Sequence, residues 1–160
     1  MARATSVERG AQVRFPPPLV FLGCILLGVA FQYVVVPAPV PVGRASSTIG
    51  GILILMAGLG FIASARILFS RTGQNPIPWK PSPELILKGP YRFTRNPMYI
   101  GITLFELGLG LTVNNLWISS LAATALLTVH FIAVRPEERY LSDKFGESYK
   151  AYLAQVRRYL

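Results

Sequence analysis

The sequence predicts an all-α, polytopic membrane protein with four transmembrane helices and a cytoplasmic amphipathic helix at the C-terminus. Three observations predict this class. Of the 160 residues, 52% are hydrophobic and only 14% are charged, whereas charged residues make up about a quarter of an average soluble domain. The apolar residues are gathered in four long runs. All Lys and Arg residues lie outside these runs.

The four apolar runs are the expected membrane spans. They cover residues 19–36, 49–65, 98–113 and 116–134. The first, second and fourth have the length of roughly 17 to 25 residues that a spanning helix needs. The third is shorter and contains Glu106, but only Asn114 and Asn115 separate it from the fourth, so we expect a tight helical hairpin within the membrane. Residues 1–160 are expected to form a single membrane domain.

The distribution of positive charge predicts the topology. Of the 16 Lys and Arg residues, only Arg44 lies between the first two runs. The others lie before the first run, between the second and third, and after the fourth, which are alternate sides of the four spans. By the positive-inside rule, both termini and the long central loop are therefore cytoplasmic. The expected location is a bacterial inner membrane, with an endoplasmic-reticulum-like membrane as the alternative, in contact with membrane lipids.

Composition also excludes several classes of protein. Disorder requires low hydrophobicity and high charge, which this chain lacks. The net charge of +9 could indicate nucleic acid binding, but the topology already explains the cations, so we expect no nucleic acid partner. The single Cys24 rules out a cysteine-based zinc site within one chain, and no metal is expected. Seven glycines in the second and third runs are expected to allow close helix packing. They are Gly50, Gly51, Gly58, Gly60, Gly101, Gly108 and Gly110.

The C-terminal residues predict a further helix. Pro136 suits a first helical turn, and Glu137 and Glu138 complement the positive end of a helix dipole. Apolar residues then recur at helical spacing to about Tyr159, with an interruption near Gly146. We expect this helix to lie on the membrane surface or to cover the cytoplasmic face of the protein.

A first candidate site lies at the cytoplasmic start of the third run. Pro97 fits the start of a helix, which leaves the backbone N–H groups of Met98 and Tyr99 free to bind an anion. Arg95 adds positive charge, and Tyr91 and Tyr99 add aromatic faces. The alternative is an interfacial anchor, because Tyr and Arg are common at membrane borders.

A second candidate site lies at the end of the fourth run. The carboxylates of Glu137 and Glu138 could bind an ammonium group or accept a proton, or could simply form a solvated helix start. His130 lies on roughly the same helical face and is either functional or hydrogen-bonded to a neighbouring helix. Glu106 should face the bundle interior, because a carboxyl group is unfavourable in hydrocarbon.

Both candidate segments resemble one known family. Residues 89–99 read GPYRFTRNPMY and resemble the G-x-Y-x-x-x-R-[HN]-P-x-Y signature of isoprenylcysteine carboxyl methyltransferases and related phospholipid methyltransferases. Residues 137–152 read EERYLSDKFGESYKAY and resemble the E-E-x-x-L-x-x-x-F-G-x-x-Y-x-x-Y pattern of the same family. The resemblance covers about residues 76–160, together with the hydropathy of the first half.

This resemblance implies an integral membrane enzyme that uses S-adenosylmethionine and methylates a lipophilic or small-molecule acceptor at the cytoplasmic face. It implies that Glu137 binds the cofactor and that other residues form the pocket. These are Leu85, Ile86, Tyr91, Asn96, Pro97, Met98 and Tyr99. Arg95 suits the cofactor's carboxylate, His130 is a further candidate contact, and Glu138 is the candidate proton acceptor.

Two other functions stay open at this stage. A membrane reductase of the steroid-reductase type would bind a reduced nicotinamide dinucleotide phosphate, although paired carboxylates favour a cationic cofactor. A non-enzymatic membrane scaffold would bind anionic lipids through its basic loops.

Overall fold

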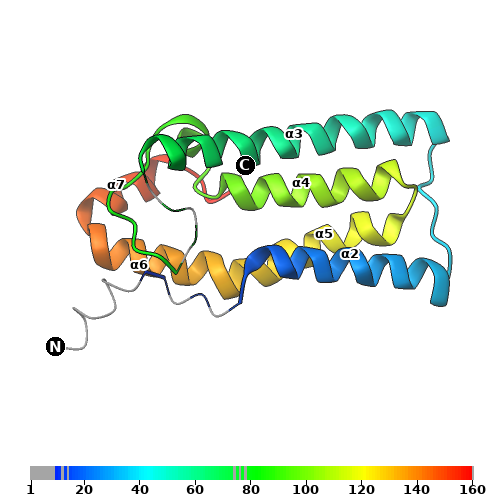
Figure 1. Ribbon diagram of the computed structural model, residues 1–160, viewed down its shortest axis with the longest axis horizontal. Coiled ribbons are helices and arrows are strands. Elements are labelled where there is room, and N and C mark those ends of the chain that lie inside the picture. Colours follow the sequence, from blue (N-terminus) through cyan, green and yellow to red (C-terminus); the bar gives the residue numbers. More distant parts are fainter. Residues whose placement is uncertain are drawn as a thin grey trace.

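Four helices form the body of the protein in the computed structural model, which describes residues 10, 11, 13, 15–73, 75, 77 and 79–159. They are α2 (Pro17–Val34), α3 (Arg44–Arg71), α4 (Pro97–Thr112) and α5 (Leu116–Val129). The helices pack in the order α3–α4–α5–α2 (Figure 1). No strand occurs in the described residues, so the all-α prediction is confirmed.

Three helices are long and apolar enough to cross a membrane. They are α2, the 28-residue α3, and a continuous 30-residue helix over Leu116–Phe145. At 16 residues, α4 is about 24 Å long, which is shorter than the hydrocarbon core of roughly 30 Å. The protein is therefore an integral membrane protein with three helices of spanning length, and the fourth predicted span stays a prediction.

The hairpin between α4 and α5 is as tight as the sequence predicted. Only residues 113–115 separate the two helices. Asn114 adopts a left-handed conformation with φ 59°, which asparagine tolerates better than most residues. Its side chain accepts a hydrogen bond from the backbone N–H of Val40, while the Asn115 side chain accepts one from Ile118 and so caps α5. The hairpin is thereby tied to the loop between α2 and α3.

The junction after the fourth run differs from the prediction. The sequence predicted a separate helix from Pro136, but α5 continues through a π-turn, η2 (His130–Val134), directly into α6 (Arg135–Phe145). The backbone N–H of Arg135 bonds to the carbonyl of His130, five residues earlier. This wider turn lies just before Pro136, whose ring and missing N–H would disrupt an ordinary helical turn.

Apart from the loop between α2 and α3 and the α4–α5 turn, the remaining chain gathers at one end of the bundle, which we call the site end (left in Figure 1). Here α6 is followed by α7 (Glu147–Gln155) and by the C-terminal tail, residues 156–159. The break between α6 and α7 lies at Gly146, whose φ of 51° suits glycine, and the sequence predicted this interruption. A short 3-10 helix, η1 (Gly89–Arg92), precedes α4.

Glycines bring α3 and α4 into backbone contact. A Cβ atom placed on Gly58 would lie 2.6 Å from the carbonyl oxygen of Gly101, and one on Gly108 would lie 2.6 Å from that of Gly51. The two pairs are one heptad apart on each helix, so they repeat on the same faces. Four of the predicted packing glycines thus have that role between α3 and α4. Gly110 has it against α5, where a Cβ atom would lie 2.5 Å from the backbone nitrogen of Ser119, whereas Gly50 and Gly60 face open space.

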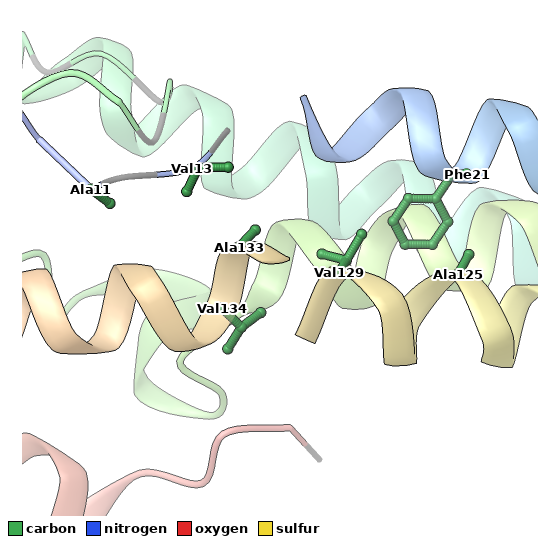
Figure 2. Packing of buried hydrophobic residues seen from close by; sticks show 7 residues of the cluster. All are labelled: Ala11, Val13, Phe21, Ala125, Val129, Ala133 and Val134. Carbon is green, nitrogen blue, oxygen red and sulfur yellow. The ribbon is translucent and has the colours of Figure 1, made fainter. Parts of the chain in front are cut away.

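A buried apolar cluster joins α2 to the continuous α5–α6 helix. Phe21 of α2 packs over Ala125 and Val129 of α5, next to Ala133 and Val134 of η2 (Figure 2). Tyr99 and Ile102 of α4 border this cluster. The cluster fixes the site-end halves of α2, α4 and α5 relative to one another.

Candidate active site

The two sequence segments that carried the resemblance meet at the site end. Residues 89–99 lead into the start of α4, and Glu137 lies on the first turn of α6. A cavity of about 350 Å³, which we call the main cavity, lies between them. Its volume is within the range of roughly 300–1,000 Å³ that is typical of small-molecule sites. Seven of the predicted site residues line it: Tyr91, Arg95, Asn96, Pro97, Met98, Tyr99 and Glu137.

Leu85 and Ile86 lie in an adjoining hollow. This hollow, of about 80 Å³, is also lined by Tyr91 and Arg95. The two predicted apolar residues therefore lie next to the main cavity and share walls with it. A ligand that extends past Tyr91 would reach them.

Tyr99 and Glu137 form the central polar contact of the cavity. The Tyr99 hydroxyl donates a hydrogen bond of 2.5 Å to the Glu137 carboxylate. Burial raises the pKa of the Glu137 carboxyl group to about 7, although the hydrogen bond from Tyr99 opposes this rise. Near neutral pH the group is therefore poised between its neutral and anionic forms, and a cation bound beside it would favour the anion.

Tyr91 is held from two sides. Its backbone carbonyl accepts a 2.7 Å hydrogen bond from the hydroxyl of Tyr152 on α7. Its ring packs edge-on against Phe69 of α3, with the ring centroids 6.1 Å apart. Burial raises the pKa of the Tyr91 hydroxyl, so this group stays neutral. Tyr91 therefore offers a fixed aromatic face and an uncharged hydroxyl.

The start of α4 supplies the positive part of the cavity. Pro97 occupies the first turn, as the sequence predicted, and Met98 and Tyr99 follow it with their N–H groups at the positive end of the helix. Two guanidinium groups belong to the same lining, from Arg95 and from Arg66 of α3. An anionic group would be stabilised at this side of the cavity and a cationic group at the Glu137 side.

Comparisons with known proteins agree with this geometry. A sequence model of a family described as phospholipid methyltransferase matches residues 46–148. The chain belongs to the phospholipid methyltransferase family. The matched region begins in α3 and ends in α7, so it includes η1, the start of α4 and the Glu137 turn.

A shorter similarity links the chain to a curated bacterial protein. Over 63 residues it is 33% identical to the cobalt-zinc-cadmium resistance protein CzcN of Cupriavidus metallidurans. The similarity covers 39% of this chain and 29% of that protein. Membership of a methyltransferase family therefore rests on the family match, and that match supports an enzyme.

Two of the predicted site residues lie outside the cavity. Glu138 does not line the main cavity; its carboxylate is bound by Arg158 and lies 3.3 Å from Arg95. It points away because neighbouring residues on a helix face different directions. His130 also lies outside the cavity, and its Nδ1 atom is 3.0 Å from the Tyr159 hydroxyl. Its contact is therefore with the C-terminal tail.

Several cavity residues were not predicted from sequence. They are Arg66 and Phe69 at the end of α3, Trp79 in the central loop, Pro16–Pro18 at the start of α2, and Tyr140 on α6. Position offers a signal for Arg66 and Phe69, since they end a membrane run on the same side as the signature segment. The N-terminal prolines carried no such signal.

Glu106 lies apart from the cavity. As predicted, it faces the interior of the bundle, with 0% exposure. Neither of its carboxylate oxygens has a hydrogen-bond partner among the described residues.

Proposed function

We propose that this protein transfers a methyl group from S-adenosylmethionine to a lipophilic or small membrane-accessible acceptor at the cytoplasmic face of its membrane. The proposal rests on one observation: the signature segment, residues 89–99, and Glu137 line the same cavity. Family membership supports methyl transfer as the reaction class.

The donor groups of the cavity fit this cofactor. S-adenosylmethionine combines an ammonium, a carboxylate, a sulfonium and an adenosine. Glu137 would accept the ammonium, because its carboxylate already accepts a hydrogen bond from Tyr99 and has the opposite charge. The start of α4 and Arg95 would bind the carboxylate. The faces of Tyr91 and Trp79 suit the sulfonium and the purine.

When bound, the cofactor supplies an electrophilic methyl group on its sulfonium. The contribution of this chain is then to orient the cofactor and the acceptor and to exclude water. The proline, aromatic and aliphatic side chains of the lining exclude water. We expect Glu137 to pair with the cofactor's ammonium group and so to orient the cofactor. It is therefore not the group that takes up a proton from the methyl acceptor.

The position of the cavity supports a lipophilic acceptor. Its lining includes Pro17 and Pro18 at the start of α2 and Met98 and Ile102 on α4. The cavity therefore adjoins helices that we expect to enter the bilayer. An acceptor with an apolar body in the membrane could present its reacting group at the site end.

The proposed topology places the site end in the cytoplasm. The positive-inside distribution of Lys and Arg supports this orientation. With α4 counted as a short span next to α5, both termini lie on the cytoplasmic side, as expected for a bacterial inner membrane protein. Local thinning of the bilayer accommodates a short span at modest cost.

Radiolabelled methyl transfer tests the proposal. Purified protein in lipid nanodiscs is incubated with methyl-labelled S-adenosylmethionine and a total lipid and small-thiol extract, and labelled products are identified. We expect a labelled acceptor with the natural chain and a strong reduction with Tyr99→Phe and Glu137→Gln. Calorimetry with S-adenosylhomocysteine and with the reduced dinucleotide phosphate supplies the second measurement. Binding of only the dinucleotide would overturn the proposal in favour of a reductase.

A further inference from the structure

The C-terminal tail, residues 156–159, returns to the segment that precedes α4. After α7 ends at Gln155, Val156 is extended, with φ −122° and ψ 131°. The backbone carbonyl of Arg157 accepts a 3.0 Å hydrogen bond from the backbone N–H of Arg95. No residue of the tail belongs to the lining of the main cavity, so the tail lies behind the cavity wall.

The carbonyl of Arg158 holds two further groups of the same segment. It accepts a 3.0 Å hydrogen bond from the Thr94 hydroxyl and another of 3.0 Å from the Asn96 side-chain amide. Thr94 is completely buried and Asn96 is 7% exposed. A buried donor that loses its acceptor is destabilising, so these two side chains depend on the position of the tail. Asn96 is itself part of the cavity lining.

Glu138 joins the tail to the cavity wall by charge. Arg158 binds its carboxylate through two hydrogen bonds, of 2.9 Å from Nε and 2.7 Å from Nη2. The guanidinium of Arg95 approaches the same carboxylate at 3.3 Å. The side chains of Arg95 and Glu138 are 11% and 16% exposed, so their contact is shielded, whereas the Arg158 side chain is 41% exposed. The two-point pair of Arg158 with Glu138 is nevertheless geometrically specific.

The end of the tail is fixed by a separate contact. The Tyr159 hydroxyl lies 3.0 Å from Nδ1 of His130 on the π-turn. The tail is thus attached to the α5–α6 helix at His130 and Glu138, and to the cavity wall at residues 94–96.

We propose that the C-terminal tail acts as a clamp that positions Arg95 and Asn96 for cofactor binding, with Arg158 and Glu138 as its positioning residues. This inference rests on the proposed function. Neither Arg158 nor Glu138 lines the main cavity, so both act through the residues they hold. The proposal also gives Glu138 a role in place of proton acceptance.

Paired substitutions test the clamp in the full-length chain. Arg158→Gln removes the ion pair but keeps the tail backbone. Arg157→Gln is the matched control, because Arg157 is an exposed neighbour of equal charge whose side chain makes no hydrogen bond or ion pair with the described residues. The affinity for S-adenosylhomocysteine is measured by calorimetry in nanodiscs, and kcat and the KM for S-adenosylmethionine are measured where activity is found.

We expect Arg158→Gln to weaken S-adenosylhomocysteine binding about tenfold and Arg157→Gln less than about twofold. Glu138→Gln, which also removes the contact with Arg95, should weaken binding at least as much as Arg158→Gln. The double variant should be little worse than Glu138→Gln alone, because Glu138→Gln already removes the contact that Arg158→Gln removes. The KM for the cofactor should rise while kcat at saturation changes little. Equal affinity of the two arginine variants would overturn the clamp, as would a fall in kcat alone for Glu138→Gln, which is the signature of a proton acceptor.

Hydrogen exchange separates the clamp from the proposed function. The Arg95 backbone N–H should exchange faster in Arg158→Gln than in Arg157→Gln, with no cofactor present. If the natural chain does not bind S-adenosylhomocysteine, the proposed function fails. The exchange rates of the Arg95 N–H in the two variants still test whether the tail holds Arg95, and equal rates would refute the clamp. If Arg158→Gln fails to fold, Arg158→Lys, which keeps the charge without the two-point geometry, should show a smaller effect of the same kind.

Discussion

Replacement of Glu137 by glutamine removes the carboxylate that we expect to bind the cofactor's ammonium group, while the side chain keeps its size and can still accept the hydrogen bond from Tyr99. A hydrogen bond between charged groups is worth roughly 1.5–3 kcal/mol. We therefore expect S-adenosylhomocysteine to bind to Glu137→Gln about 10- to 100-fold more weakly than to the natural chain at pH 8. Glu147→Gln, an exposed carboxylate on α7 paired with Lys150, should bind normally.

The affinity for S-adenosylhomocysteine should also depend on pH through Glu137. With a pKa of about 7, Glu137 is about one-tenth ionised at pH 6 and about nine-tenths ionised at pH 8. The ammonium group of S-adenosylhomocysteine selects the ionised form of Glu137, so the affinity of the natural chain should rise about tenfold between these pH values. Calorimetry at pH 6, 7 and 8 measures the change. The same pH dependence in Glu137→Gln would refute the assignment of the ammonium to this carboxylate.

The same group should affect the stability of the ligand-free protein in the opposite sense. Because its pKa is raised from 4.5 to about 7, the folded chain holds a proton that the unfolded chain releases above pH 4.5. The free energy of unfolding therefore falls, through this group, as pH rises from about 4.5 to about 7. Thermal melts should show Glu137→Gln gaining more in Tm over the natural chain at pH 8 than at pH 5. An equal difference at both pH values would contradict the raised pKa.

Three further substitutions test packing. Gly58→Ile should destabilise the protein by roughly 1–3 kcal/mol, because its Cβ would meet the Gly101 carbonyl, whereas Gly60→Ile, which faces open space, should be tolerated in thermal melts. Glu106→Leu should raise the Tm, because it removes a buried carboxyl group without a partner among the described residues; a lower Tm would indicate that Glu106 has a polar partner in the membrane. Tyr152→Phe should lower the unfolding free energy by about 1 kcal/mol, because its hydroxyl bonds to the backbone of η1, and an unchanged denaturation midpoint would show that this bond is not important.

Local features of the sequence were sufficient for most of the helical body. Hydrophobic runs located both ends of α2 and α4 and the start of α5 to within two residues, because membrane helices are defined by long apolar stretches with sharp polar borders. The α3 helix is longer than its apolar run, since it begins at Arg44 and continues to Arg71. Helix formation does not stop where the apolar residues stop, so hydropathy alone underestimates such a helix.

The junction at Pro136 shows where local rules fail. Proline and the two carboxylates after it are typical of a helix start, and the sequence was interpreted in that way. A π-turn instead lets the helix continue. Ala133 and Val134 of this turn lie in the buried cluster with Phe21 of α2, and no local pattern contains that tertiary contact.

The residues of the candidate site also differ in whether local sequence could predict them. Residues in the two contiguous signatures could be predicted, because they lie on segments with a recognisable order and spacing. Trp79 and the tail residue Arg158 could not, because each reaches the site or its wall through a fold-dependent return of the chain. Glu138 points away from the cavity because it follows Glu137 on the helix, but its ion pair with Arg158 is a tertiary contact that the sequence does not show.

Photo-crosslinking tests the central claim most directly, namely that the signature segment and the Glu137 turn form one cofactor site. The purified full-length chain in nanodiscs is irradiated with tritiated S-adenosylmethionine, cleaved, and mapped by peptide. We expect the label to lie within residues 85–102 or 135–141 and to disappear with excess unlabelled S-adenosylhomocysteine. Label confined to other parts of the chain, or label that the competitor does not remove, would contradict it.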